Sequence, residues 1–354
     1  MAQIEGKKST WKTQNRGIRQ GCPLSPYLFL LVMSIMFDDI HAEKDFSSGQ
    51  LDILAHTEVL YADDTVVITK DEPTMTSLLE AIERHARNMG LAFNKAKCNA
   101  LNFNTAEQAS FADGTPVPLA KEVVYLGSIL SSTHNHRREV AKRKAAAMAT
   151  WKRLDIFWKK ANCPPKFKLI VLDAVVRSKL VYGLDCIKIP DAALNTLNAF
   201  QLKGIRKILG IHTTFINRAN TNQTVFDQAT EVRYGDKNRK DNTQLEMRSF
   251  SQYLHQKNAD ILGHIIRADP NDPMRSVSLQ PGTNIPRTHE NRRVGRPRHH
   301  LLISTYERVW KALPQNCVLN DFKAGIRNNI QDIASQAHNR TGVFAPPLKS
   351  KKKN

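Results

Sequence analysis

The stretch EVLYADDTVVIT, residues 58–69, carries the pattern from which the fold and the chemistry of this chain are first predicted. Residues 58–60 and 65–69 are rich in apolar and β-branched side chains and flank a short polar segment, which is typical of a two-stranded hairpin. Aspartate is favoured in such a turn because its side chain bonds to nearby backbone groups. The stretch therefore predicts a β-hairpin with Asp63 and Asp64 at its tip.

Two adjacent carboxylates on an apolar hairpin indicate a metal site. Carboxylates that lie close together repel each other unless a cation compensates their charge. Mg²⁺ prefers one or two carboxylates together with substrate phosphates, and two such ions about 3.5–4 Å apart can activate a 3′-hydroxyl. The alternative is an exposed Asp-Asp turn without a chemical role, because aspartate is common in turns. The hairpin by itself leaves both interpretations open.

Helices and further strands are predicted around the hairpin. Ser25 is a good N-cap and Pro26 suits the first helical position, which predicts a helix as far as about His41. Mixed strands and helices up to about residue 135 indicate an α+β unit. Its other elements, predicted from apolar periodicity and turn residues, are a helix at 71–89, short strands at 91–93 and 100–103, and a hairpin or strand pair within 118–130.

The rest of the chain is predicted to be helical. Loops are expected over the polar residues 211–245, and a linker over residues 269–298, which are rich in Pro, Asn and Arg. The tail at 349–354 is expected to be disordered. Helices are predicted from apolar spacing at 138–160, 167–187, 192–209 (closed by Gly210), 247–267, 299–313 and 319–338.

The charge is distributed unevenly within a net charge of +19. Residues 1–135 hold 12 Lys and Arg against 16 Asp and Glu, whereas residues 136–215 hold 17 against 5 and residues 216–354 hold 23 against 12. A basic surface of this size favours a polyanionic partner, most simply a nucleic acid. A solubilising surface without a partner is the alternative.

Several classes of protein are disfavoured by composition. The longest apolar run, Tyr27–Phe37, is much shorter than the roughly 20 residues that span a bilayer, and Met1–Thr10 has no apolar signal-peptide core. An intracellular location, in the cytoplasm or the nucleus and without a membrane partner, is expected. The five cysteines contain no C-x-x-C pair, which argues against a disulfide framework and a cysteine zinc site.

Segments in a characteristic order resemble the reverse transcriptases of non-LTR (LINE-like) retrotransposons. GIRQGCPLSPYLF at residues 17–29 resembles motif B of that family, and YADD at 61–64 resembles motif C. Gly90-Leu91, Asn94 and Lys97-Cys98 resemble motif D, and YLGS at 125–128 resembles the primer-grip segment. The similarity continues through LVYG at 180–183, IRKILG at 205–210, LGHIIR at 262–267 and GRPR at 295–298.

The resemblance implies a fold, a reaction and partners. The fold would be a partial polymerase palm, an incomplete right-hand fold with motifs B to E, over residues 1–135. A helical thumb-like region would follow at 136–215, then a helical basic C-terminal region at 216–354 that includes the linker. The full-length enzyme would be an RNA-directed DNA polymerase that uses an RNA template, a DNA primer or target, and dNTP, with Mg²⁺ or Mn²⁺ as cofactor.

The resemblance also implies roles for residues of the palm. Asp63 would bind the catalytic metal ions, with Asp64 beside it in a less direct role. The residues expected to line the template and incoming nucleotide are Gln20, Gly21 and Pro23, with Lys97 near the pyrophosphate, and those expected to support the primer end are Tyr125, Leu126 and Gly127.

Basic side chains are expected to hold the nucleic-acid backbone, because a polymerase that copies any sequence must grip phosphates. The candidates in the thumb-like region are Arg138, Lys142, Arg143 and Lys144. A second basic stretch in the linker would follow phosphates or enter a minor groove, although a plain basic linker is an equal alternative; it contains Arg292, Arg293, Arg296 and Arg298.

One family feature is missing near the start of the sequence. The family has a further metal-binding aspartate, in motif A, some tens of residues before motif B, whereas the sixteen residues before Gly17 contain no Asp. The hypothesis is therefore that this polypeptide is a fragment, inactive alone, whose partner is a missing N-terminal polymerase segment. A non-catalytic nucleic-acid-binding fragment and a retroelement remnant without function are the alternatives.

Overall fold

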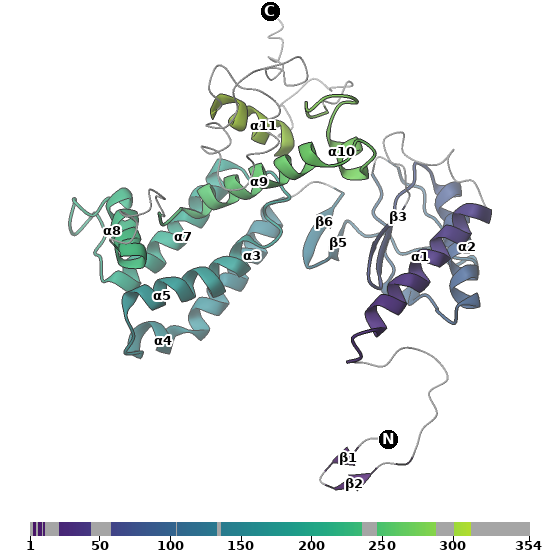
Figure 1. Cartoon of the computed structure of the whole chain (residues 1–354), viewed down its shortest axis with the longest axis horizontal. Coiled ribbons are helices and arrows are strands. Elements are labelled where there is room, and N and C mark those ends of the chain that lie inside the picture. Colours follow the sequence, from purple (N-terminus) through teal and green to yellow (C-terminus); the bar gives the residue numbers. More distant parts are fainter. Residues whose placement is uncertain are drawn as a thin grey trace, which may run out of the picture. The chain divides into compact units, whose positions relative to one another are not determined.

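The computed structural model describes residues 3–4, 6–8, 10, 21–43, 58–103, 105–132, 136–235, 246–287 and 301–312. Packing divides the chain into unit 1, which is Met1–Tyr125 with Leu130–Thr133, and unit 2, which is Leu126–Ile129 with His134–Asn354. Unit 1 combines two long helices with short strands, and unit 2 is mainly helical (Figure 1). Helices mixed with small sheets agree with the α+β class expected for the first part of the chain.

The strands of the described residues form three separate two-stranded sheets. The paired strands are β1 (Gln3–Ile4) with β2 (Lys7–Lys8), β3 (Glu58–Tyr61) with β4 (Asp64–Val67), and β5 (Glu122–Tyr125) with β6 (Ser128–Ser131). The hairpins predicted around residues 62–63 and within 118–130 are thereby confirmed.

The strands predicted at residues 91–93 and 100–103 are wrong. Residues 91–94 have no regular structure, and Ala100 forms a single bridge with Leu119. Leu91 and Phe93 instead pack partly buried against the helical core of unit 1. These apolar side chains are therefore covered by a helix pair and do not form a strand. The 3₁₀ turn η2 (Lys95–Lys97) follows directly.

Helices α1 (Ser25–Glu43) and α2 (Glu72–Asn88) form the core of unit 1. Asp71 caps α2, because its side chain accepts a hydrogen bond from the Thr74 amide at 2.9 Å. Leu60 of β3 and Val67 of β4 pack against this core, so the hairpin rests on the helix pair. The buried residues at the contact are Met33, Met36, Phe37 and Ile40 of α1 and Leu78, Ala81, Ile82 and Ala86 of α2.

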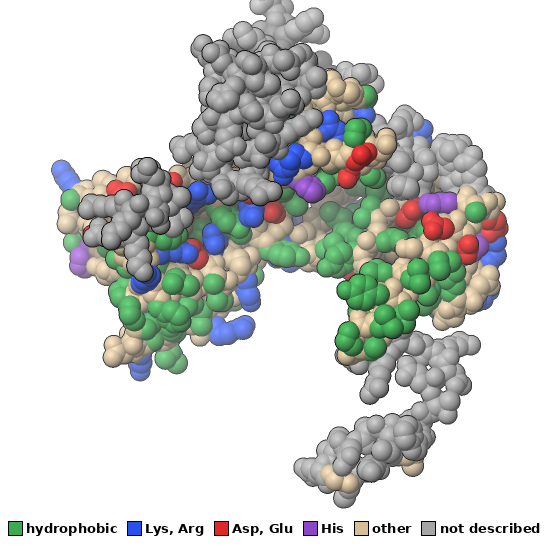
Figure 2. All heavy atoms as spheres, viewed as in Figure 1, with side chains coloured by type: hydrophobic (Ala, Val, Ile, Leu, Met, Phe, Trp, Pro, Cys, Tyr) green, Lys and Arg blue, Asp and Glu red, His purple; other side chains and the backbone are tan. Residues whose placement is uncertain are grey.

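Helix α1 is apolar on its outer face as well. Large apolar side chains are exposed there, and Figure 2 shows green side chains gathered over α1. A helix that is apolar all round is normally buried. The exposed residues of this face and of the adjoining loop are Leu24, Tyr27, Leu28, Leu30, Leu31 and Ile35.

Unit 2 is built from helices around one large core. Helix α9 lies beside α7, and α11 packs on α9 (Figure 1). The stacked rings of Trp151 and Trp158, 4.5 Å apart, belong to this core. The elements are α3 (His136–Arg153), α4 (Asp155–Lys160), α5 (Pro165–Val171), the π-helical turn η3 (Leu172–Arg177), α6 (Ser178–Val181), α7 (Asp191–Leu209), α8 (Asn222–Tyr234), α9 (Phe250–Arg267), α10 (Pro273–Ser278) and α11 (Leu301–Ala312).

Predicted helix boundaries in unit 2 are partly confirmed. Helix α7 ends at Gly210, whose φ of 69° is left-handed, as expected for a glycine stop. The helix predicted at 138–160 is divided at Leu154, and the one predicted at 167–187 ends at Val181. Gly183, with φ of 68°, turns the chain soon after that end.

Two predictions of irregular structure in unit 2 are wrong. Helix α8 lies where loops were expected: Thr221 caps it, and the fully buried Val225 and Ala229 anchor it at helical spacing. Helix α10 lies inside the expected linker, where Asp272 caps it and Arg275 donates to the Ile266 carbonyl at 2.6 Å. In both places a few buried or capping residues outweigh a polar local composition.

The remaining expectations fall outside the described residues. These are the helix predicted at 319–338, the tail at 349–354, and the basic stretch at 292–298. Within the described part of the chain, no helix is both long enough and apolar enough to cross a membrane.

Candidate active site

The tip of the β3–β4 hairpin carries the two candidate carboxylates. Tyr61 pairs with Asp64, which leaves Ala62 and Asp63 as a two-residue loop. Ala62 has a φ of 55°, a left-handed conformation that costs an L-residue with a Cβ about 1–2 kcal/mol. Two-residue hairpin loops require such a conformation. The tight turn therefore places Asp63 at the tip and Asp64 at the first position of β4.

The side chains of Asp63 and Asp64 are exposed and make no ion pair or hydrogen bond with the residues that the structure describes. Their oxygens are thus available to a ligand. Mg²⁺ typically takes one or two protein carboxylates and fills its other positions with water and phosphate oxygens. The donor set at the hairpin fits such an ion, although no cluster of three His, Cys, Asp or Glu forms among the described residues.

Tyr125, at the end of β5, is electrostatically coupled to this hairpin. Burial, followed by the negative charge of Asp64, raises the pKa of the Tyr125 phenol. Its hydroxyl oxygen is buried and has no hydrogen-bond partner among the described residues. The structure therefore brings a residue predicted for the primer grip close to a residue predicted for the metal site.

The segment before α1 is turned at Gly21. Its φ of 82° is in the left-handed region, and a Cβ there would meet no atom within 4 Å, so the backbone is open to a ligand. Pro23 is exposed, and the Ser25 amide donates to the Cys22 carbonyl at 3.2 Å as α1 begins. Gln20, predicted for the same surface, lies outside the described residues.

The two lysines of η2 differ in their surroundings. Lys95 forms ion pairs with Asp113 at 2.8 Å and Glu83 at 3.3 Å. The hydrogen bond between Lys95 and Asp113 is the main cause that raises the pKa of Lys95 and lowers the pKa of Asp113. Lys97 is exposed, and its ammonium makes no contact of this kind in the described part of the chain. Lys95 thus forms ion pairs within the protein, whereas Lys97 is available to a ligand.

The β5–β6 turn is held by helices of unit 2. Leu126 and Gly127 both have positive φ, 46° and 78°, as the two central residues of a type I′ turn require. The Gly127 carbonyl accepts hydrogen bonds from Lys142 Nζ at 3.0 Å and Arg143 Nη2 at 2.8 Å. The hydroxyl of Tyr182 donates to the Leu126 carbonyl at 2.9 Å. Both exposed carbonyls of the turn are thereby occupied by the protein itself.

A buried carboxylate supports this arrangement. Glu139, only 3% exposed, forms an ion pair with Arg143 and accepts a hydrogen bond from the Ile129 amide at 2.9 Å. The Arg143 guanidinium also lies over the Tyr182 ring, 4.7 Å from its centroid. We call the set Leu126, Gly127, Ser128, Glu139, Lys142, Arg143 and Tyr182 the turn clamp.

Comparison with known proteins finds similarity to reverse transcriptases. Residues 1–130 match the model of the reverse transcriptase (RNA-dependent DNA polymerase) family. The chain is 25% identical over 224 residues to the retrovirus-related Pol polyprotein from type-1 retrotransposable element R2 of Popillia japonica, and 33% identical over 94 residues to that of Nasonia vitripennis. Residues 1–130 are thus similar to reverse transcriptases, and the two relatives are polyproteins of retrotransposable elements.

The matches cover part of each protein. The Popillia match takes in 59% of this chain and 36% of the relative, and the Nasonia match takes in 27% of this chain and 9% of the relative. A putative transposon-derived protein of Caenorhabditis elegans is 23% identical over 167 residues, which is 45% of this chain and 58% of that protein. Each match thus covers less than two thirds of the length of the relative.

The predicted backbone-binding side chains of α3 are placed differently from one another. Arg138 is exposed and Lys144 is half-buried. Lys142 and Arg143 donate to the Gly127 carbonyl, so part of their hydrogen-bonding capacity is used within the protein itself. The basic residues at 292–298 lie outside the described part of the chain.

Residue-level roles for Glu139 and Tyr182 were missed by sequence reasoning. Tyr182 lay within the LVYG segment that resembles the family, but the segment carried no role. Gly183 is explained by the same geometry, because a Cβ there would collide with Ser128 Oγ. Tyr182 and Leu126 are 56 positions apart, so no local pattern indicates their contact.

Proposed function

We propose that this chain is part of an RNA-directed DNA polymerase that copies an RNA template onto a DNA primer. The exposed and unpaired Asp63 and Asp64, on a hairpin braced by the α1–α2 core, are the observation that carries the proposal. In this reaction the primer 3′-oxygen bonds to the α-phosphorus of a dNTP, and pyrophosphate leaves. The family match over residues 1–130 supports the same reaction.

The side chains of unit 1 take distinct roles in this proposal. Asp63 and Asp64 would hold divalent ions, Mg²⁺ or Mn²⁺, which supply positive charge at the reacting phosphate when bound. Lys97 would place its free ammonium near the departing pyrophosphate and offset its charge. Gly21 and Pro23, with Gln20 before them, would border the template and the incoming nucleotide, where a glycine lets the backbone approach closely.

The elements after the hairpin are proposed to hold the primer and duplex. Residues 1–135 would be a partial palm with motifs B to E, and residues 136–215 a thumb that grips phosphates through side chains such as Arg138 and Lys144. The turn clamp supports a more specific role. Because Lys142, Arg143 and Tyr182 hold the turn at residues 126–127, the primer-grip turn would move with the helices of unit 2.

A further carboxylate is needed to complete this chemistry. Two ions in one site are bridged by ligands from more than one strand, whereas Asp63 and Asp64 come from a single hairpin. We therefore propose that the third carboxylate is supplied in trans, by a motif A segment on another polypeptide. The expected consequence is that the 354-residue chain alone does not extend a primer.

The test is primer extension on an RNA template with Mg²⁺, using the full chain with Asp63→Asn as the disabled variant. Asp38→Asn, which removes an exposed carboxylate from α1, is the matched control. The experiment is repeated after a motif A segment from an R2 relative is added in trans or fused to the chain. Extension that requires both the added segment and Asp63 supports the whole proposal.

Two other outcomes would distinguish the polymerase activity from the need for an added motif A segment. Extension by the chain alone that is lost in Asp63→Asn but kept in Asp38→Asn would support the polymerase and refute the need for a further segment. No extension by a folded chain, even with the added segment, would refute the polymerase. Circular dichroism of each variant establishes that it is folded.

A second candidate function is nucleic-acid binding without catalysis, which the excess of Lys and Arg after residue 136 favours. Binding of this kind weakens steeply with salt because phosphate contacts release counterions. The affinity of the full chain for an RNA–DNA duplex is measured from 50 to 200 mM salt. A steep logarithmic slope with no Asp63-dependent extension under any condition would favour this second function, and a flat slope would exclude it.

A further inference from the structure

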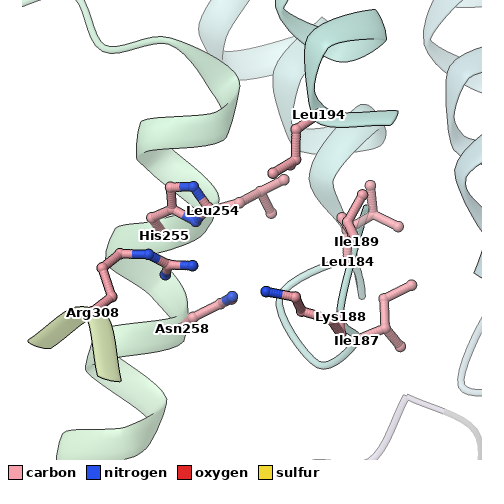
Figure 3. A pocket seen from close by; sticks show the side chains of 9 residues that line it. All are labelled: Leu184, Ile187, Lys188, Ile189, Leu194, Leu254, His255, Asn258 and Arg308. Atoms are coloured by element: carbon pink, nitrogen blue, oxygen red, sulfur yellow. The ribbon is translucent and has the colours of Figure 1, made fainter. Parts of the chain in front are cut away.

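A cavity in unit 2 brings together polar side chains that lie far from the β3–β4 hairpin in sequence. The cavity is bounded by the segment after α6, the start of α7, and helices α9 and α11 (Figure 3). Apolar side chains, among them Leu184 and Leu254, form its walls. Four polar side chains also line it: Lys188 from the segment before α7, His255 and Asn258 from α9, and Arg308 from α11.

These polar groups face one another across the cavity. Figure 3 shows the Lys188 ammonium extending from one wall toward Asn258 and Arg308 on the facing wall. The Asn258 amide nitrogen donates to the carbonyls of Asp185 at 3.0 Å and Leu254 at 2.9 Å, which leaves its oxygen toward the donors. The polar surface of the cavity therefore consists mainly of hydrogen-bond donors.

Two nitrogen atoms of these side chains have no hydrogen-bond partner in the described part of the chain. Nη1 of Arg308 and Nδ1 of His255 are buried and make no hydrogen bond within the described residues, and neither Lys188 nor Arg308 forms an ion pair there. The carboxylates of Asp191 and Glu307 act on Lys188 through space but lie outside ion-pair distance. Buried donors without partners are destabilising and rare in native proteins. A cavity lined by such side chains therefore indicates a ligand that supplies hydrogen-bond acceptors.

The electrostatics are consistent with an anion. Burial, followed by the charge of Arg308, lowers the pKa of Lys188. Burial first and these two cations next lower the pKa of His255 to about 4, so the imidazole is neutral at physiological pH. A neutral imidazole still has one N–H, which either ring nitrogen can carry. Asp191 opposes these shifts at Lys188, His255 and Arg308, and Glu307 opposes them at Lys188, but burial is the larger cause at each group.

The size of the cavity restricts what enters it. The innermost space is about 10 Å³, which is room for about one oxygen-sized group, and it lies within about 250 Å³ of empty volume that includes open solvent. A compact anion would place a single oxygen among the donors and keep its remaining atoms at the mouth. Arginine is especially common at phosphate oxygens because its fork of donors matches them.

We propose that this cavity binds a non-bridging phosphate oxygen, either of inorganic phosphate or of a nucleic-acid backbone. Arg308, Lys188 and His255 would donate to the oxygen, and Asn258 would orient Lys188. The choice of phosphate among compact anions rests on the proposed polymerase function, whereas the anion site rests on the cavity alone. Because the site lies on α9, α11 and the segment that leads into α7, it would fix unit 2 on a phosphate independently of the hairpin.

The test uses the full chain labelled with ¹⁵N-histidine and titrates inorganic phosphate at constant ionic strength. The imidazole signal of His255, assigned with His255→Gln, is expected to shift and saturate. In Arg308→Gln the affinity should fall about tenfold or more, since one charge-assisted hydrogen bond is lost. Arg218→Gln, which removes an exposed arginine from unit 2, is the matched control and should leave the titration unchanged.

The source of the phosphate is distinguished in a second arm with a short oligonucleotide. Saturation by the oligonucleotide alone would assign the site to a backbone phosphate, and saturation by inorganic phosphate alone would assign it to the free anion. No saturable shift with either ligand, or an equal shift in Arg308→Gln, would mean that the cavity holds water only and would overturn the proposal. The unfolding midpoint of each variant shows that it is folded, and Lys188→Gln provides a second variant. Neither arm depends on primer extension.

Discussion

Replacement of Arg143 by methionine tests whether the turn clamp stabilises unit 2. The side chains of Arg143 and Glu139 are 11% and 4% exposed, so their ion pair is largely shielded from water. Methionine keeps much of the aliphatic volume but removes the donors to Gly127 and Ser128 and leaves the Glu139 carboxylate without its cation. Removal of one partner from a buried pair costs about 3–5 kcal/mol in the free energy of unfolding.

The energy of the pair itself is separated from the cost of a stranded charge by a double-mutant cycle. Glu139→Gln removes the charge but retains an oxygen that can accept from the Ile129 amide. The double variant Arg143→Met/Glu139→Gln should therefore be more stable than the sum of the two single changes predicts, by about 1–3 kcal/mol. Urea unfolding gives these values, followed by tryptophan fluorescence because Trp151 and Trp158 lie in the core of unit 2.

The control is Arg153→Met, which removes an exposed arginine from the last turn of the same helix. Its expected cost is at most about 1 kcal/mol, the usual contribution of a cation near a helix C-terminus. Equal losses of unfolding free energy in Arg143→Met and Arg153→Met would refute a stabilising role of the turn clamp. Simple additivity of the changes at Arg143 and Glu139 would also refute it, because the two side chains would then not be coupled.

Three further outcomes are expected. Ala62→Gly should stabilise unit 1 by roughly 1 kcal/mol in urea unfolding, because glycine adopts the left-handed φ without strain; an unchanged or lower midpoint would contradict this. Gly183→Ala should destabilise unit 2, since its Cβ meets Ser128 Oγ, and Ser128→Ala should restore part of the loss in the double variant but leave the cost of the positive φ. The ion pair with Lys95 lowers the pKa of Asp113, so its stabilisation is complete above the unfolded pKa of about 3.9 and lost as pH falls below it. The difference in urea midpoint between wild type and Asp113→Asn should therefore be present at pH 6 and shrink toward pH 3; a difference independent of pH would exclude this cause.

The parts of the fold that could be predicted share a local cause. The hairpin at residues 62–63 follows from apolar β-branched runs around a short polar turn, and the end of α7 follows from Gly210. The predictions that were wrong share the opposite cause. Helix α8 looks polar in sequence, yet Val225 and Ala229 anchor it in a core made by distant helices.

The candidate site divides in the same way. Asp63, Asp64 and Lys97 could be selected from motifs because they lie within short segments whose order is characteristic of the family. The different fates of Lys95 and Lys97 could not be predicted, because Asp113 and Glu83 reach Lys95 from other parts of the chain. Likewise, Arg143 looked like one of several basic side chains on a helix until its contact with Gly127 distinguished it.

The sequence by itself indicated the resemblance to reverse transcriptases, the position of the carboxylate pair, the uneven charge and most of the helices. Each of these depends on residue type and on spacing over a few positions, where backbone preferences and turn chemistry act. Only the tertiary structure decided which cations form ion pairs within the fold and which make none among the described residues. It also decided that Tyr182 holds Leu126 and that Lys188, His255 and Arg308 share one cavity. Such contacts join residues tens of positions apart, and they form because burial of apolar side chains brings their helices together.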